Sequence, residues 1–91
     1  MKQLQTIAAM MQRLRADPPN RLLGKAVTVE DLLPDNDVLR LSWPDGRVVI
    51  RPSGTEPKLK AYLEVIVPDG DAARAGELLA QLRGQVSAAL A

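Results

Sequence analysis

A short loop, "RPSGTEPK" from Arg51 to Lys58, has the composition of an anion-binding segment. Pro52 and Pro57 have no backbone N–H, so four consecutive amide donors lie between two residues that cannot donate. Gly54 can adopt the backbone angles that turn successive amides inward, as in an anion-binding nest. We therefore expect these amides to converge on one anion.

The side chains of the loop favour the same ligand. Ser53 and Thr55 offer short hydroxyl donors, and Arg51 offers a planar fork that matches two phosphate oxygens. Lys58 adds a second positive charge. The predicted phosphate site therefore consists of Arg51, Ser53, Gly54, Thr55 and Lys58.

Two alternatives remain open at the loop. Glu56 would repel a phosphate dianion, so its carboxylate must point outward, pair with a cation or contact a sugar hydroxyl. The loop could also be a proline-stiffened turn whose hydroxyls cap its own backbone. It is not a nucleotide P-loop, because it lacks the spaced glycines and the Gly-Lys-Ser/Thr ending.

The composition excludes much enzyme chemistry. The chain of 91 residues has neither cysteine nor histidine, which excludes disulfides, thiolate nucleophiles, imidazole bases and the usual zinc ligands. We predict no catalytic residue and no metal ligand. The formal net charge of +1 suggests no particular partner, and the apolar runs are too short to span a bilayer, so we expect one cytoplasmic domain over residues 1–91.

The apolar spacing predicts an α+β domain. Helices are expected over residues 3–15, ended by "DPPN", and from about Asp71, a plausible cap. Between them the pattern predicts strands in "KAVTVEDLL", "VLRLSW", "RVVIR" and "KLKAYLEVIV", with a hairpin turn at Asp45 and Gly46. The two helices should cover one face of a four-stranded antiparallel sheet and leave the other face free.

The stretch "RVVIRPSGTEPKLKAYLEV", Arg47 to Val65, closely resembles the signature of the carboxy-terminal domain of the alpha-D-phosphohexomutases, the phosphoglucomutase and phosphomannomutase family. "LLPDNDVLRL" before the hairpin and the closing amphipathic helix fit the order of elements in that domain. The resemblance implies a TATA-binding-protein-like fold, in agreement with the helices and antiparallel sheet expected here.

The resemblance also implies a function. Members of this family are four-domain enzymes that move a phosphoryl group between the C1 and C6 hydroxyls of a hexose through a bisphosphorylated sugar. They use a phosphoserine and a magnesium ion, and neither of the corresponding motifs is present here. This chain should therefore be the fourth domain, which grips the non-reacting phosphate of a hexose phosphate and works with the other three domains.

The sequence also allows interpretations other than a phosphate-binding domain. The polar sheet face, with Arg40, Arg47, Lys58, Lys60 and Tyr62, could bind single-stranded nucleic acid, although the chain has only one Trp and one Tyr. A solvated strand face is the alternative for both lysines, favoured for Lys60 but not for Lys58. Tyr62 could be a lid or simple cover, and a helical stripe could form a dimer interface. A small terminal domain of this kind is also expected to rotate on a hinge, at "DPPN" or before Met1.

Overall fold

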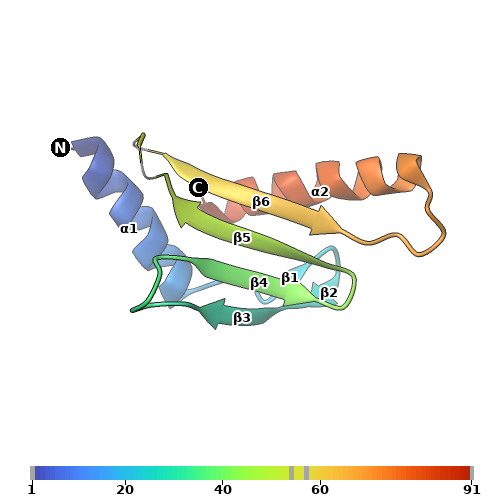
Figure 1. Ribbon diagram of the computed structural model, residues 1–91, viewed down its shortest axis with the longest axis horizontal. Coiled ribbons are helices and arrows are strands. Elements are labelled where there is room, and N and C mark those ends of the chain that lie inside the picture. Colours follow the sequence, from blue (N-terminus) through green and yellow to red (C-terminus); the bar gives the residue numbers. More distant parts are fainter. Residues whose placement is uncertain (1, 54, 57, 91) are drawn as a thin grey trace.

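The computed structural model describes residues 2–53, 55–56 and 58–90, with side chains from Thr6 onward. Two helices enclose a series of strands along the chain (Figure 1). The elements in order are α1 (Lys2–Ala16), β1 (Arg21–Leu22), β2 (Lys25–Ala26), β3 (Thr28–Asp31), β4 (Leu39–Trp43), β5 (Gly46–Pro52), β6 (Leu59–Val65) and α2 (Ala72–Leu90). No helix in this part of the chain is both long and apolar enough to cross a bilayer.

The main sheet has four antiparallel strands in the order β3-β4-β5-β6. The predicted hairpin is confirmed: β4 and β5 pair from Leu39 with Ile50 to Trp43 with Gly46, around a turn at Pro44 and Asp45. β5 and β6 pair along their full length, from Gly46 with Val65 to Pro52 with Leu59. The α+β prediction is therefore confirmed, and the arrangement is consistent with a TATA-binding-protein-like fold.

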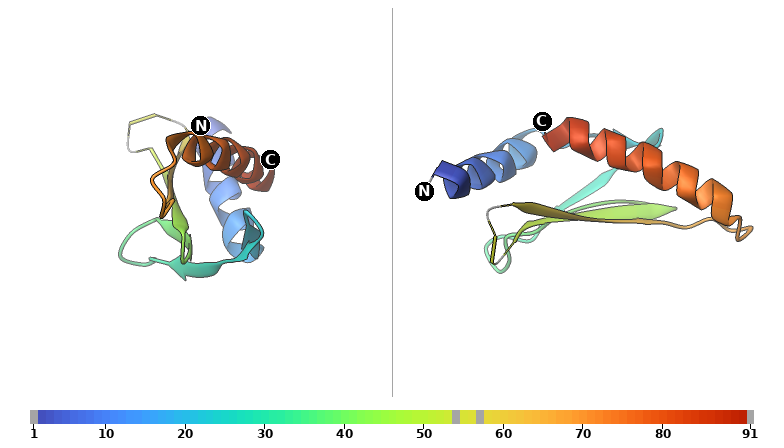
Figure 2. Two further views of the ribbon diagram at one scale, coloured as in Figure 1. Left: turned by 90° about the vertical axis from the view of Figure 1, so that its right-hand side faces the viewer. Right: turned by 90° about the horizontal axis from the view of Figure 1, so that it is seen from above.

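Both helices cover the same face of the sheet (Figure 2, right). Met11 and Leu14 from α1, and Leu82 and Val86 from α2, are buried as the helical spacing predicted. They pack with a layer of strand residues, namely Leu22, Leu39, Leu41, Trp43, Val48 and Ile50. The opposite face of the sheet, which we call the open face, has no helix over it (Figure 2).

A small two-stranded sheet was not predicted. β1 and β2 pair through a turn in which Leu23 has a φ of 53° and Gly24 a φ of 73°. The predicted strand over "KAVTVEDLL" is consequently split between β2 and β3. The backbone N–H of Leu23 donates to Gln85 Oε1 at 2.8 Å, so a contact with the distant helix α2 helps to fix this turn.

The second helix starts as predicted. Asp71 Oδ1 accepts a hydrogen bond of 3.1 Å from the backbone N–H of Arg74, which satisfies one donor of the first turn. The helix then continues through Gly76 and Gly84 to Leu90. This cap fixes where the chain turns back over the sheet after β6.

The first helix is firmly attached to the sheet, which corrects one expectation. Arg15 forms ion pairs with Asp31 at 3.1 Å and with Asp37 at 2.6 Å, while Met11 and Leu14 lie in the core. "DPPN" is therefore a turn inside one packed unit rather than a hinge.

These ion pairs predict how stability depends on pH. The backbone N–H of Leu33 and the Arg15 guanidinium lower the pKa of Asp31 from its ordinary value of 3.8. Because the pKa is lower in the folded state, this contribution to stability is complete above pH 3.8 and is lost as pH falls through the folded-state pKa. Asp31→Asn should therefore reduce the free energy of unfolding at pH 7 and flatten its decline as pH falls below 3.8.

Urea unfolding at each pH, followed by the fluorescence of Trp43, measures this effect. Asp35→Asn is the matched control, because the structure shows no ion pair for Asp35 among the described residues. An equal loss of stability at pH 7 and pH 2 in Asp31→Asn would contradict the prediction.

Candidate functional site

The predicted loop joins β5 to β6 at the end of the sheet nearest the start of α1 (Figure 1). The backbone N–H of Ser53 donates to the carbonyl of Lys58 at 2.8 Å, which extends the β5-β6 ladder by one bond beyond Pro52 and Leu59. The N–H of Lys58 donates to the carbonyl of Glu56, also at 2.8 Å. The loop is therefore a compact turn held by its own backbone.

The expectation of four free, convergent amides is not met in this conformation. Besides the Ser53 amide, the N–H groups of Thr55 and Glu56 are used within the loop, because both donate to Ser53 Oγ, at 3.3 and 3.2 Å. Gly54, the fourth predicted donor, lies outside the described residues, as does Pro57. A serine hydroxyl in a turn often accepts hydrogen bonds from backbone amides close to it in the chain. The structure therefore shows the alternative in which a loop hydroxyl caps the loop's own backbone.

This geometry nevertheless leaves the two hydroxyl groups of the loop able to donate. A serine oxygen that accepts two amide hydrogens keeps its own hydroxyl hydrogen, and accepting strengthens it as a donor. Thr55 is exposed, so its hydroxyl is accessible from the same loop. Moreover, two amides already converge on one point, the Ser53 oxygen, which is the arrangement that an oxyanion would require.

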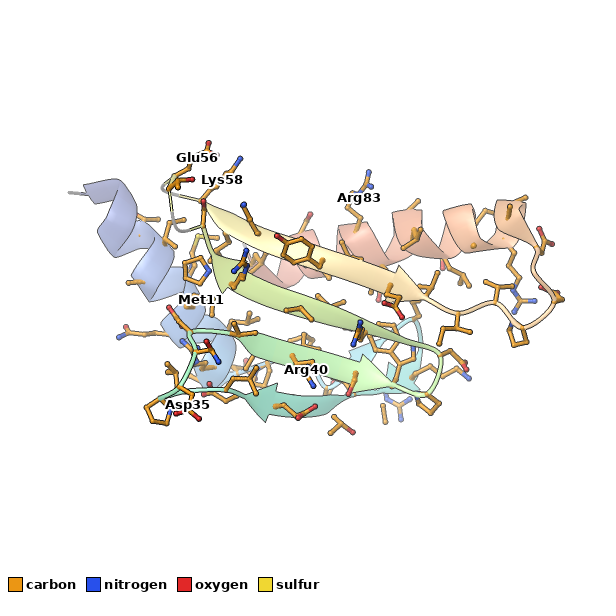
Figure 3. All side chains as sticks on the ribbon, in the orientation of Figure 1. Met11, Asp35, Arg40, Glu56, Lys58 and Arg83 are labelled. Atoms are coloured by element: carbon orange, nitrogen blue, oxygen red, sulfur yellow. The ribbon has the colours of Figure 1, made fainter. Side chains whose placement is uncertain are left out.

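Glu56 is accounted for by an ion pair. Its carboxylate lies 3.4 Å from Lys58 Nζ, and both side chains project from the loop beyond the end of the sheet (Figure 3). Of the possibilities left open for Glu56, the structure shows pairing with a lysine. Lys58 is thereby partly neutralised, which makes it a weaker contributor to an anion site than Arg51.

The cross-strand register brings a second cation beside Arg51. Arg51 on β5 lies directly opposite Lys60 on β6, and among the described residues neither forms an ion pair with a carboxylate. Like charges directly opposite each other destabilise a sheet, and an anion between them would remove that repulsion. From the sequence, Lys60 could belong either to a polar binding face or to a solvated face, because its position opposite Arg51 depends on the register.

Tyr62 is the second residue that the sequence left undecided. The guanidinium carbon of Arg51 lies 5.8 Å from the centroid of the Tyr62 ring, within the range of a cation–π interaction. A side-chain hydrogen bond from Arg51, together with the charges of Arg51 and Lys60, lowers the pKa of the Tyr62 hydroxyl. The two side chains border a shallow depression of about 310 Å³ on the open face.

The remaining cations of the open face are paired. Arg40 lies 3.5 Å from Glu30, and Arg47 lies 3.2 Å from Glu64. Figure 3 shows Arg40 over the middle of the sheet, away from the loop that carries Glu56 and Lys58. Among the described residues of this face, the cations without a carboxylate partner are therefore Arg51 and Lys60, which are neighbours and not a stripe along the sheet.

The site has the properties of a binding site for an oxyanion. It combines a guanidinium, an ammonium group and hydroxyl donors, and the chain has no histidine or cysteine to act as base or nucleophile. Within residues 2–53, 55–56 and 58–90, no three acidic, histidine or cysteine side chains are grouped so that they could hold a metal ion.

Comparison with known proteins identifies the family of the chain. Residues 1–85 match the family model described as "Phosphoglucomutase/phosphomannomutase, C-terminal domain". Similar proteins include phosphoglucomutases of Staphylococcus haemolyticus (strain JCSC1435), 37% identical over 69% of this chain and 15% of the relative, and of Staphylococcus aureus (strain MRSA252), 32% identical over 71% and 15%. No solved structure gave a significant match.

The alignments also place the chain within its relatives. It spans about 15% of the length of the phosphoglucomutases it matches, so those proteins contain much more than this domain. The family match covers the loop and every strand and helix described above, apart from the last residues of α2. The chain therefore belongs to the phosphoglucomutase/phosphomannomutase family and corresponds to its C-terminal domain.

Proposed function

We propose that this domain binds the non-reacting phosphate of a hexose phosphate and contributes no catalytic group of its own. The observation that carries the proposal is the cross-strand pair of Arg51 and Lys60, which lacks a carboxylate partner among the described residues and lies beside the hydroxyl-bearing loop. The proposed ligands are Arg51, Ser53, Thr55 and Lys60, with Lys58 as a weaker contributor. Gly54 stays a prediction from the sequence.

The chemistry of these groups suits a phosphate dianion. The Arg51 fork and the Lys60 ammonium group supply two charges, and hydrogen bonds between charged partners are about twice as strong as neutral ones. The Ser53 hydroxyl can donate without any change in the loop. If a phosphate oxygen replaces Ser53 Oγ, the Thr55 and Glu56 amides, which already converge there, can donate to it instead.

In the parent protein, binding of the non-reacting phosphate would contribute to catalysis indirectly. We propose that the parent moves a phosphoryl group between the C1 and C6 hydroxyls of a hexose, with a magnesium ion and a phosphoserine on its other domains. Binding of the remote phosphate would orient the sugar so that its other end faces the reacting centre. The sugar turns over between the half-reactions. Contacts made only with the phosphate group therefore suit both orientations of the sugar.

A titration tests the phosphate site directly. Inorganic phosphate and glucose 1-phosphate are added separately to the ¹⁵N-labelled chain at constant ionic strength, and amide shifts are followed. We expect saturable changes confined to residues 51–60, with a Kd of roughly 1 mM, because one phosphate is held by a few contacts. Glucose is the matched control and should cause no change.

Two results would overturn the proposal. One is the absence of a saturable shift with phosphate up to the solubility limit, and the other is a set of shifts spread over the helices instead of the loop. Titration with a single-stranded oligonucleotide separates the nucleic-acid alternative. Strong shifts at Arg40 and Arg47 would favour that alternative, although both cations are already paired with carboxylates.

A further inference from the structure

We propose that Tyr62 is a positioning residue that holds the Arg51 guanidinium over the open face, ready to receive phosphate. This inference rests on the proposed function and adds a residue that does not itself contact the ligand. It starts from the distance of 5.8 Å between the Arg51 guanidinium carbon and the Tyr62 ring centroid.

The sheet register explains why the two side chains meet. Val49 pairs with Tyr62 and Arg51 pairs with Lys60, so Tyr62 is the diagonal neighbour of Arg51 across the β5-β6 ladder. A diagonal pair is within reach of long and aromatic side chains. The directly opposite residue, Lys60, repels Arg51, so Tyr62 is the neighbour on β6 that can attract it.

Arg51 is restrained differently from the other arginines of this face. Arg40 and Arg47 each have a carboxylate partner, whereas the contacts shown for Arg51 in the described structure are with the tyrosine. A carboxylate would neutralise the guanidinium and compete with phosphate for its N–H donors. An aromatic ring attracts the cation through its π face and leaves the full positive charge available.

A restraint on the Arg51 side chain matters because this side chain is exposed to solvent. Arg51 is exposed and Tyr62 is 51% exposed, so a free arginine side chain would sample many rotamers. Ordering a long side chain on binding reduces affinity, and a side chain that is already ordered loses less. Tyr62 should therefore strengthen phosphate binding by about two- to fivefold, the fold-change that corresponds to an exposed cation–π pair.

The first experiment needs no ligand. The Arg51 Nε–Hε resonance is compared in the wild-type chain, Tyr62→Phe and Tyr62→Leu, using ¹⁵N relaxation to measure the order of the side chain. We expect a partial loss of order in Tyr62→Phe, which keeps the ring but lacks the hydroxyl that accepts from Arg51, and a larger loss in Tyr62→Leu. Equal order in all three chains would overturn the proposal.

The second experiment is a double-mutant comparison with inorganic phosphate as the ligand. Tyr62→Leu should weaken binding two- to fivefold in the wild-type chain but should have no further effect in an Arg51→Gln background. An equal loss in both backgrounds would mean that Tyr62 acts independently of Arg51, and no loss in either would mean that it does not act at all. Both results would overturn the proposal.

Controls separate this inference from folding and from the proposed function. Arg47→Gln alters another cation of the same face, already paired with Glu64, and should leave phosphate affinity unchanged. Trp43 fluorescence during urea unfolding verifies that each variant is folded. If the wild-type chain does not bind phosphate, the proposed function fails, while the ligand-free order of Arg51 still decides whether Tyr62 positions it.

Discussion

Arg51→Ala is expected to lower phosphate affinity by about 10- to 150-fold, equivalent to about 1.5–3 kcal/mol for a hydrogen bond to a charged group. The side chain is exposed and its contacts in the described structure are with Tyr62, so its removal leaves no buried group unpaired. The loss should therefore appear in ligand binding and not in stability. Isothermal titration or amide shifts in the 91-residue chain measure the first, and urea unfolding measures the second.

Arg51→Lys provides the matched control, because it keeps the charge but loses the planar fork. We expect an affinity between those of wild type and Arg51→Ala. In the parent protein, Arg51→Ala should lower kcat/KM for the hexose phosphate, since a lost remote contact also misplaces the reacting end. If Arg51→Ala bound phosphate with wild-type affinity, Arg51 would not be part of the site. The pair of Arg51 and Lys60 would then have no role in binding.

Local sequence patterns were sufficient to predict most of the fold. The alternation of Leu39, Leu41 and Trp43 with Arg40 and Ser42 is observed as alternating burial along β4. The hairpin and the capped second helix were also predictable, because each depends on residues close together in the chain. These features need no knowledge of which distant residues they contact.

The parts that were missed depend on contacts between distant residues. Leu23 adopts a positive φ, which is unusual for leucine, in a turn tied to Gln85 of α2. That contact cannot be anticipated from the sequence, so β1 was not predicted, and β2 and β3 were predicted as one strand. Likewise, the position of "DPPN" inside a packed unit follows from Arg15 reaching Asp31 and Asp37.

In the candidate site, too, local features could be predicted from the sequence and features that depend on distant contacts could not. The residue types of the loop indicate an anion site, but they do not show which acceptor the loop amides bond to. Ser53 Oγ competes with an external anion for the amides of Thr55 and Glu56. The register of β5 against β6 then decides that Lys60 faces Arg51 and that Tyr62 lies diagonally. A shift of one residue would move these side chains to the other face.

Gly46→Ala is expected to destabilise the fold by about 1–3 kcal/mol, the usual cost of overpacking a core. Gly46 is buried at the start of β5, between Trp43 on β4 and Val65 on β6. A Cβ added there would lie 2.6 Å from the carbonyl oxygen of Glu64 and 2.7 Å from Cζ2 of Trp43. The first of these atoms is backbone and the second belongs to a buried ring, so neither can move away without disturbing the sheet.

Gly84→Ala is the matched control, since it adds the same methyl group in the middle of α2. A Cβ at Gly84 meets nothing within 4 Å, and alanine favours the helix over glycine by about 0.5–1 kcal/mol. Urea unfolding should therefore move the midpoint down in Gly46→Ala and up in Gly84→Ala. Equal shifts in the same direction would contradict the close packing of Trp43 and the Glu64 carbonyl around Gly46.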